Sequence, residues 1–133
     1  MSELSARFDL PLHTGSPGAA RRAVREMLAG WGFDDPDWVE RTVLVVSELV
    51  SNALVHGGGC VGVDVQAHDD VVVIGVADGS AVLPRRRDGD DAGGRGLLII
   101  DAFTDAWGTE DHQGGKRVWV RLPPHPRPAT GAA

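Results

Sequence analysis

The sequence lacks the features that mark disulfide-bonded, zinc-binding, nucleic-acid-binding and membrane-spanning proteins. Its one cysteine, Cys60, excludes a disulfide within the chain and a zinc site built on a cysteine pair. The formal net charge of -6 argues against a general binder of nucleic acids or anionic membranes, because such proteins depend on clustered lysine and arginine. No apolar run approaches the roughly 20 residues that span a bilayer, and no basic segment followed by an apolar one opens the sequence. We therefore expect a soluble cytoplasmic protein.

The length and hydrophobic content suffice for one folded domain. The chain has 133 residues, of which 42% are hydrophobic, so it can bury a substantial core. We expect a single domain over residues 1–122. Residues 123–133 are rich in proline and are expected to form a disordered tail.

Alternation and capping signals predict the order of helices and strands. Ser16 followed by Pro17, and Asp35 followed by Pro36, each predict an N-cap and a helix start. The expected elements are strands over residues 4–12, 60–67, 71–78, 105–111 and 115–123, and helices over residues 17–30, 36–56 and 97–103. Strands joined by short turns are antiparallel. The order therefore predicts an α+β fold, a two-layer α/β sandwich with a mixed, mostly antiparallel sheet and helices on one face.

Three polar residues form a column on the second expected helix. Glu48, Asn52 and His56 are spaced by four, so they lie roughly 40° apart around the helix axis. The expected core face, nearly opposite, is made of Val39, Val43, Val46, Val50 and Ala53. A partly desolvated carboxylate can act as a base, an amide oxygen suits Mg²⁺, and a histidine can donate to a phosphate or sugar oxygen. The alternative is a solvated polar stripe on an amphipathic helix.

Two later segments offer groups that would complement this column. Asp78 ends a strand of valines, where its carboxylate can accept from an exocyclic amine such as that of adenine, or cap a turn before Gly79. Gly93, Gly94 and Gly96 precede a short helix whose first amides can hold phosphate. The alternative for these glycines is a flexible hinge. They do not form a Walker loop, because the GK[ST] ending is missing.

Taken together, these segments resemble the nucleotide-binding boxes of a known superfamily. Residues 48–56, 78–80 and 94–97 resemble the N, G1 and G2 boxes of the GHKL (Bergerat-fold) ATPases, which include the histidine kinases. The small size, Trp107-Gly108 and Val118-Trp119 look most like the bacterial anti-sigma factor serine kinases. The resemblance extends over about residues 4–122.

The resemblance implies ATP and Mg²⁺ as cofactors and a role for each matching residue. Glu48 would be the general base for the incoming hydroxyl, Asn52 would hold Mg²⁺, and Asp78 would accept from the adenine amine. Residues 79–95 would form the ATP lid. The other implied nucleotide contacts are His56, Ser80, Gly94, Arg95, Gly96 and Leu97.

The resemblance also implies protein partners. These would be a sigma factor and a STAS-type anti-anti-sigma protein that is phosphorylated on serine, with a homodimer as a further possibility. Nucleic acid and membrane partners are not expected. The sequence does not tell which proteins these partners are.

Three positions depart from the pattern of the superfamily. Ser80 stands where the G1 box has its first glycine, and 90–92 is Asp-Asp-Ala where a basic residue is common. Lys116, between Gly115 and Arg117, replaces the threonine that often precedes the last strand. Phosphotransfer to a partner serine is the first hypothesis. The second is a nucleotide-binding module that regulates a partner by binding alone, and the third is an interaction domain without a nucleotide site.

Overall fold

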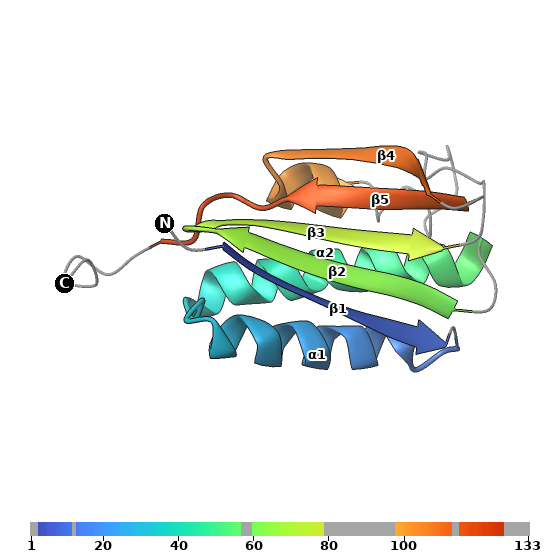
Figure 1. The fold of residues 1–133 in the computed structure, drawn as a ribbon, viewed down its shortest axis with the longest axis horizontal. Helices are drawn as coiled ribbons and strands as arrows, with labels where there is room; N and C mark the ends of the chain where they lie inside the picture. Colours follow the sequence, from blue (N-terminus) through green and yellow to red (C-terminus); the bar gives the residue numbers. More distant parts are fainter. Residues whose placement is uncertain (1–2, 12, 57–59, 79–97, 113–114, 127–133) are drawn as a thin grey trace.

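A five-stranded antiparallel sheet with helices on one face forms the body of the protein (Figure 1). The structure is a computed structural model that describes residues 3–11, 13–56, 60–78, 98–112 and 115–126. Its elements are β1 (Glu3–Pro11), α1 (Ser16–Gly30), α2 (Pro36–His56), β2 (Cys60–His68), β3 (Val71–Asp78), β4 (Ala106–His112) and β5 (Gly115–Arg121), and residues 98–103 are also helical. The strand order is β1-β2-β3-β5-β4, and each described pairing is antiparallel. The predicted α+β sandwich is confirmed, with a sheet that is antiparallel throughout its described strands.

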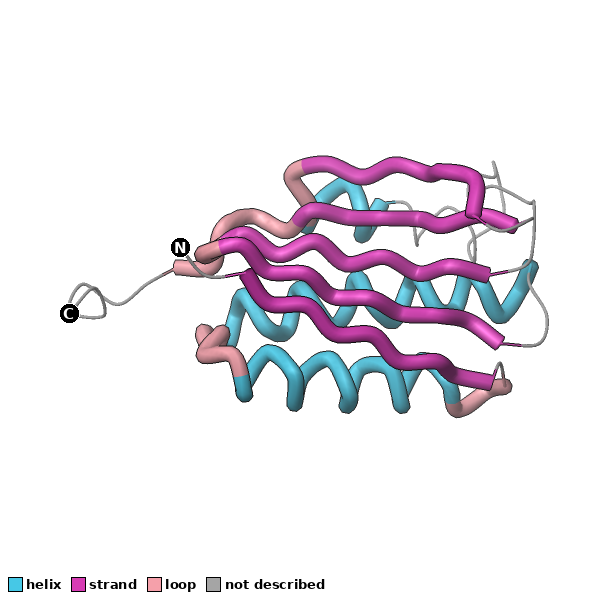
Figure 2. Tube along the Cα trace, viewed as in Figure 1, coloured by secondary structure: helices cyan, strands magenta, loops and turns pink. Residues whose placement is uncertain are grey.

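The core lies between the sheet and the helices, which stand behind it in Figure 2. Alternate residues of the sheet are buried on this inner face: Val61, Val63 and Val65 on β2, Val72, Ile74 and Val76 on β3, and Val118 and Val120 on β5. The predicted apolar face of α2 is buried against them, at Val39, Val43, Val46, Val50 and Ala53. The period of two in the strands and of about 3.6 in α2 therefore both point their apolar residues into one core.

The start of α1 differs from the prediction. Ser16 was expected to be the N-cap, but Gly15 holds that position and Ser16 is the first helical residue. The buried Ser16 hydroxyl donates to the backbone oxygen of Pro11 at 2.6 Å and accepts from the backbone N–H of His13 at 2.9 Å. The hydroxyl makes hydrogen bonds with the backbone of the turn after β1 instead of capping the first amides of the helix. The prediction of Ser16 as the N-cap is therefore wrong.

The start of α2 agrees with the prediction and is held by the C-terminal segment. A carboxylate oxygen of Asp35 accepts from the backbone N–H of Trp38 at 3.0 Å, as expected for an N-cap. The N–H of Asp35 donates to Nε2 of His125 at 3.0 Å, and the indole of Trp38 donates to the oxygen of Pro123 at 2.7 Å. The buried His125 ring also meets the ring of Phe33 edge to face. Residues 123–126, which the sequence assigned to the tail, are therefore packed against the body.

The fold brings the predicted site elements to one end of the sheet. The C-terminal ends of α2 and β3 both lie at the right in Figure 1, and the helix of residues 98–103 enters from that side. Helix α2 also contacts β3 directly. Within the described residues, no helix is both long enough and apolar enough to span a membrane.

Candidate functional site

Glu48 and Asn52 lie on the flank of α2 that faces away from α1. Helix α1 contacts the other flank, where Arg21 donates to the Ser47 hydroxyl at 2.7 Å and Arg25 pairs with Glu40. In Figure 2, α2 lies between α1 and the helix of residues 98–103. Glu48 and Asn52 are half-buried there, next to buried apolar residues of the same helix. A half-buried carboxylate and amide on this flank match the semi-buried position that the column predicts.

Several other predicted site residues lie wholly or partly outside the part of the chain that the structure describes. His56 is the last residue of α2, and the orientation of its side chain lies outside what the structure describes. The predicted contacts of the later boxes also lie outside the described residues, namely Ser80, Gly94, Arg95, Gly96 and Leu97, as does the predicted lid over 79–95. Their roles stay predictions.

Asp78 lies on the inner face of the sheet, at the last position of β3. Its cross-strand neighbour on β5 is Lys116, the only lysine in the sequence. The Lys116 ammonium lies 3.4 Å from a carboxylate oxygen of Asp78, and both side chains are only 2% exposed. The carboxylate that would accept from an adenine amine thus already faces a buried cation.

Lys116 is a residue whose role sequence reasoning missed. The sequence indicates which face of its strand Lys116 occupies, but not the register that pairs it with Asp78. Its replacement of the usual threonine was noted, but no partner was assigned to it. Val118 and Val120 alternate with it on the final strand, which places Lys116 on the apolar face of that strand. An antiparallel pairing of this strand with the one ending at Asp78 then sets the two side chains opposite one another.

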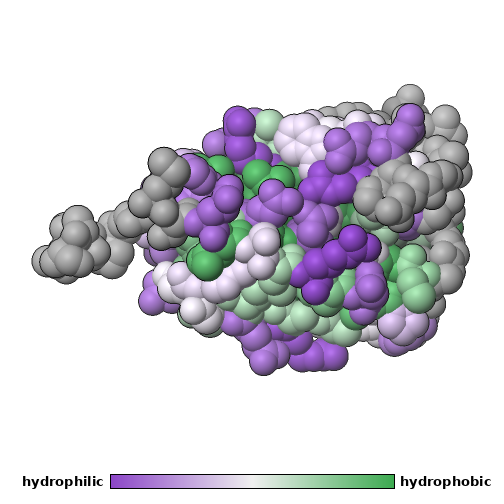
Figure 3. Space-filling model, viewed as in Figure 1, coloured by the Kyte–Doolittle hydropathy of each residue, from purple (hydrophilic) through white to green (hydrophobic). Residues whose placement is uncertain are grey.

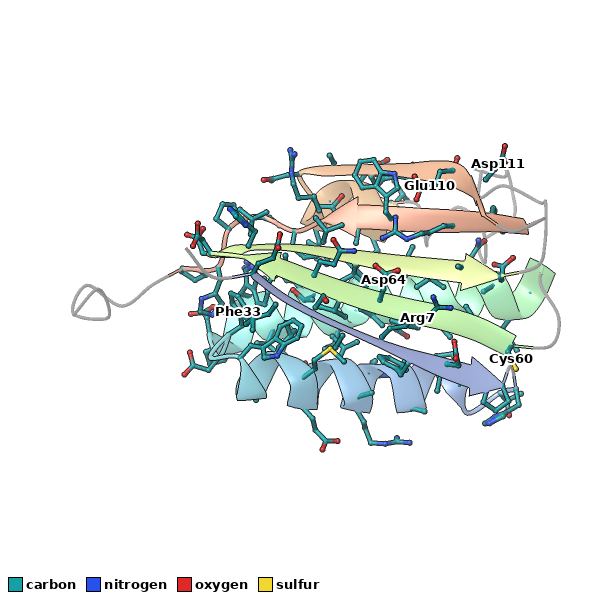
Figure 4. All side chains as sticks on the ribbon, in the orientation of Figure 1. Arg7, Phe33, Cys60, Asp64, Glu110 and Asp111 are labelled. Atoms are coloured by element: carbon teal, nitrogen blue, oxygen red, sulfur yellow. The ribbon has the colours of Figure 1, made fainter. Side chains whose placement is uncertain are left out.

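The opposite face of the sheet carries a separate polar network. Arg117 donates to both carboxylate oxygens of Asp64, at 3.1 and 2.8 Å, and to Glu110 at 3.0 Å. The hydrogen bonds with Asp64, followed by those with Glu110, raise the pKa of the Arg117 guanidinium above its ordinary value. Figure 4 shows Asp64 and Glu110 on either side of this arginine's strand.

A shallow depression of about 990 Å³ surrounds this network on the face turned toward the viewer in Figure 3. It is lined by Ser5, Ala6, Arg7, Asp64, Gln66, Val73, Glu110, Arg117 and Trp119. Because β-strand side chains alternate between faces, this depression is separated by the sheet from Asp78 on the inner face. It is not part of the predicted nucleotide site.

The described residues fit an adenine nucleotide with Mg²⁺ in their chemistry. Asn52 supplies a neutral oxygen for a hard cation, and Asp78 supplies a buried acceptor for an amine. Glu48, one helical turn before Asn52, supplies a half-buried carboxylate. No cluster of three or more His, Cys, Asp or Glu side chains able to hold a metal occurs in the described part of the chain. The Lys116 ammonium already pairs with the Asp78 carboxylate, so it would compete with an adenine amine for that carboxylate.

Comparison with known proteins places this geometry in a family. The fold is similar to that of a chain in the crystal structure of the SiaB–SiaC complex from Pseudomonas aeruginosa, at 16% sequence identity and a TM-score of 0.57. The match covers 88% of this chain and 87% of that chain. The search of curated proteins gives no match. The model of the histidine kinase-like ATPase domain matches residues 11–122, and the chain therefore belongs to this family, the GHKL ATPases.

Proposed function

We propose that this protein binds ATP with Mg²⁺ and acts as an anti-sigma factor that phosphorylates a serine of an anti-anti-sigma partner. The proposal is carried by one observation. A chain of the histidine kinase-like ATPase family presents a half-buried Glu48 and Asn52 on α2 and a buried Asp78 at the last position of β3, and the C-terminal ends of α2 and β3 lie at the same end of the sheet (Figure 1). The fold neighbour was solved in a complex, which supports a protein partner for this chain as well.

Each of these residues has a distinct task in the proposed reaction. ATP supplies the phosphoryl group when it is bound. Asn52 would hold Mg²⁺ through its amide oxygen, and Asp78 would accept from the adenine amine. Glu48 would take the proton from the partner's serine hydroxyl as the serine oxygen bonds to the γ-phosphorus. The bond from the γ-phosphorus to the oxygen that bridges to the β-phosphate would break in the same step, and ADP would leave.

A second candidate function is regulation by nucleotide binding without phosphotransfer. The buried Lys116 at the Asp78 carboxylate favours this second function, since a site that binds the adenine ring weakly suits a sensor of nucleotide level. In this candidate, nucleotide would set the shape of a partner-binding surface, and Glu48 would have no chemical task.

Transfer of labelled phosphate from ATP to partner proteins distinguishes the two candidates. Glu48→Ala is expected to lower transfer by about 100-fold or more, as removal of a positioned base does, while nucleotide affinity stays within a few-fold of wild type. Glu40→Ala, on the flank of α2 that contacts α1, is the matched control and should leave transfer unchanged. Transfer that survives Glu48→Ala would show that this base is wrongly assigned. Nucleotide binding without transfer to any partner would leave the second candidate.

A further inference from the structure

The ion pair between Lys116 and Asp78 lies in surroundings where a charged pair is costly. Its neighbours along β3 and β5 on the inner face are the buried side chains of Val76 and Val118. Lysine is almost never fully buried unless it is paired. Replacement of a buried ion pair by apolar residues is often neutral or stabilising. Stability alone therefore does not account for this pair. Because Asp78 is the predicted acceptor for the adenine amine, the pair suggests a role in nucleotide binding.

The geometry shows what a ligand would meet at Asp78. Both side chains are 2% exposed, and the lysine ammonium lies beside the carboxylate oxygen that an incoming amine would seek. The ammonium lies 3.4 Å from the carboxylate oxygen, beyond the 2.7–2.9 Å that is typical of a tight charge-assisted hydrogen bond. The pair is thus close enough to occupy the carboxylate and loose enough to be separated.

A second carboxylate is available to Lys116 on its other side. Asp111 of β4 is the cross-strand neighbour of Lys116, in the same row as Asp78, and its side chain is exposed. Figure 4 shows Asp111 near the end of β4, beyond β5. Side chains opposite one another on adjacent strands have Cβ atoms about 4.5–5.5 Å apart, within reach of the flexible lysine stem. Lys116 can therefore leave Asp78 without losing a carboxylate neighbour.

We propose that Lys116 competes with the nucleobase for the Asp78 carboxylate, and that nucleotide binding moves its ammonium from Asp78 to Asp111. This inference rests on the proposed function, because it assumes that the base binds at Asp78. Lys116 is then a residue that sets nucleotide affinity: it keeps binding weak while it pairs with Asp78. A shorter, neutral side chain at this position would remove the competition of the ammonium for this carboxylate.

Calorimetric titration with Mg-ATP tests the competition. Lys116→Thr is expected to tighten binding by about tenfold, the effect of one hydrogen bond to a charged group. In the Asp78→Asn background the same change should give no gain, because the contested carboxylate is gone. Asp111→Asn should weaken binding when Lys116 is present and have no effect on Lys116→Thr. Denaturant unfolding of each variant verifies that the titrated protein is folded.

The outcomes separate this inference from the proposed function. If wild type binds Mg-ATP and folded Lys116→Thr binds equally or more weakly, the competition is refuted and the proposed function stands. If neither protein binds nucleotide, the proposed function fails and the inference fails with it. Binding by Lys116→Thr that exceeds that of wild type supports both.

Amine-directed labelling of the unmodified protein gives an independent measurement. Because Lys116 is the only lysine, peptide mapping assigns its modification without ambiguity. The label should react slowly in the absence of nucleotide, since the side chain is 2% exposed, and several-fold faster with saturating Mg-ATP. An unchanged or slower rate with bound nucleotide would show that the ammonium does not leave Asp78.

Discussion

Gly75 allows Arg117 to reach across the open face of the sheet. A Cβ atom placed on Gly75 would overlap the guanidinium of Arg117, which passes over this position to reach Asp64 on the far side of β3. The obstacle would be the end of a flexible side chain, so the arginine would move aside and lose its paired hydrogen bonds. The absence of one side chain thus permits an ion pair between β2 and β5, strands that are not adjacent.

Gly75→Ala is expected to destabilise the protein by about 1 kcal/mol, the value of a well-oriented, partly exposed ion pair. In an Arg117→Ala background the same change should have almost no effect, because the clash and the pair are both absent. Gly30→Ala at the end of α1, where a new Cβ meets nothing within 4 Å, is the matched control and should not destabilise. Urea unfolding compares wild type, Gly75→Ala, Arg117→Ala, the double variant and Gly30→Ala. An equal loss from Gly75→Ala in both backgrounds would contradict this account.

The C-terminal segment and the start of α2 depend on one another. His125 meets the rings of Phe33 and Trp38 edge to face, with centroids 5.3 and 4.9 Å away, and accepts from the N–H of Asp35. The backbone N–H of His125 donates to the oxygen of Asp70 in the β2–β3 turn at 2.9 Å. One residue therefore joins the turn before α2 and the first turn of α2 through its side chain, and the hairpin through its backbone N–H.

His125→Ala is expected to lower the free energy of unfolding by roughly 2–3 kcal/mol, because it leaves a cavity and an unpaired amide at Asp35. His125→Phe keeps the ring but not the acceptor and should lose less. Pro124→Ala, at an exposed neighbouring position, is the control and should change little. Chemical unfolding followed by the fluorescence of the four tryptophans, which include Trp38, measures the loss. Wild-type stability of His125→Ala would show that this segment does not hold α2.

Local patterns predicted the elements well, and contacts distant in sequence account for what they missed. The period of α2 and the alternation of the strands fixed their buried faces, since burial follows directly from these periods. Ser16 was misassigned because its hydroxyl has a competing acceptor at Pro11, which a capping signal alone does not reveal. The packing of His125 depends on a partner 90 positions away. The pairing of Lys116 required the strand register, which a single strand does not specify.

In the candidate site, too, features set by local patterns were predictable, whereas a contact between distant residues was not. Helical spacing alone placed Glu48 and Asn52 on one flank of α2, and the half-buried setting of both is as expected. The position of Asp78 at a strand end was also readable from the valines before it. The pairing of the Lys116 ammonium with the Asp78 carboxylate could not be predicted in this way, because it depends on which strand lies beside β3. The order β3-β5 in the sheet thus places Lys116 beside the Asp78 carboxylate.

Nucleotide binding should raise the stability of the whole protein, because a ligand that binds only the folded state stabilises all of it. At a nucleotide concentration of 100 times Kd the gain is about 2.7 kcal/mol, and Tm should rise by several degrees for a domain of this size. Mg-ATP should raise Tm in wild type and more strongly in Lys116→Thr at equal concentration. Asn52→Ala should reduce the part of the shift that depends on Mg²⁺, whereas Gln66→Ala, on the opposite face of the sheet, should leave it intact. A flat response in both wild type and Lys116→Thr up to millimolar Mg-ATP would mean that the family's fold is retained here without its nucleotide site.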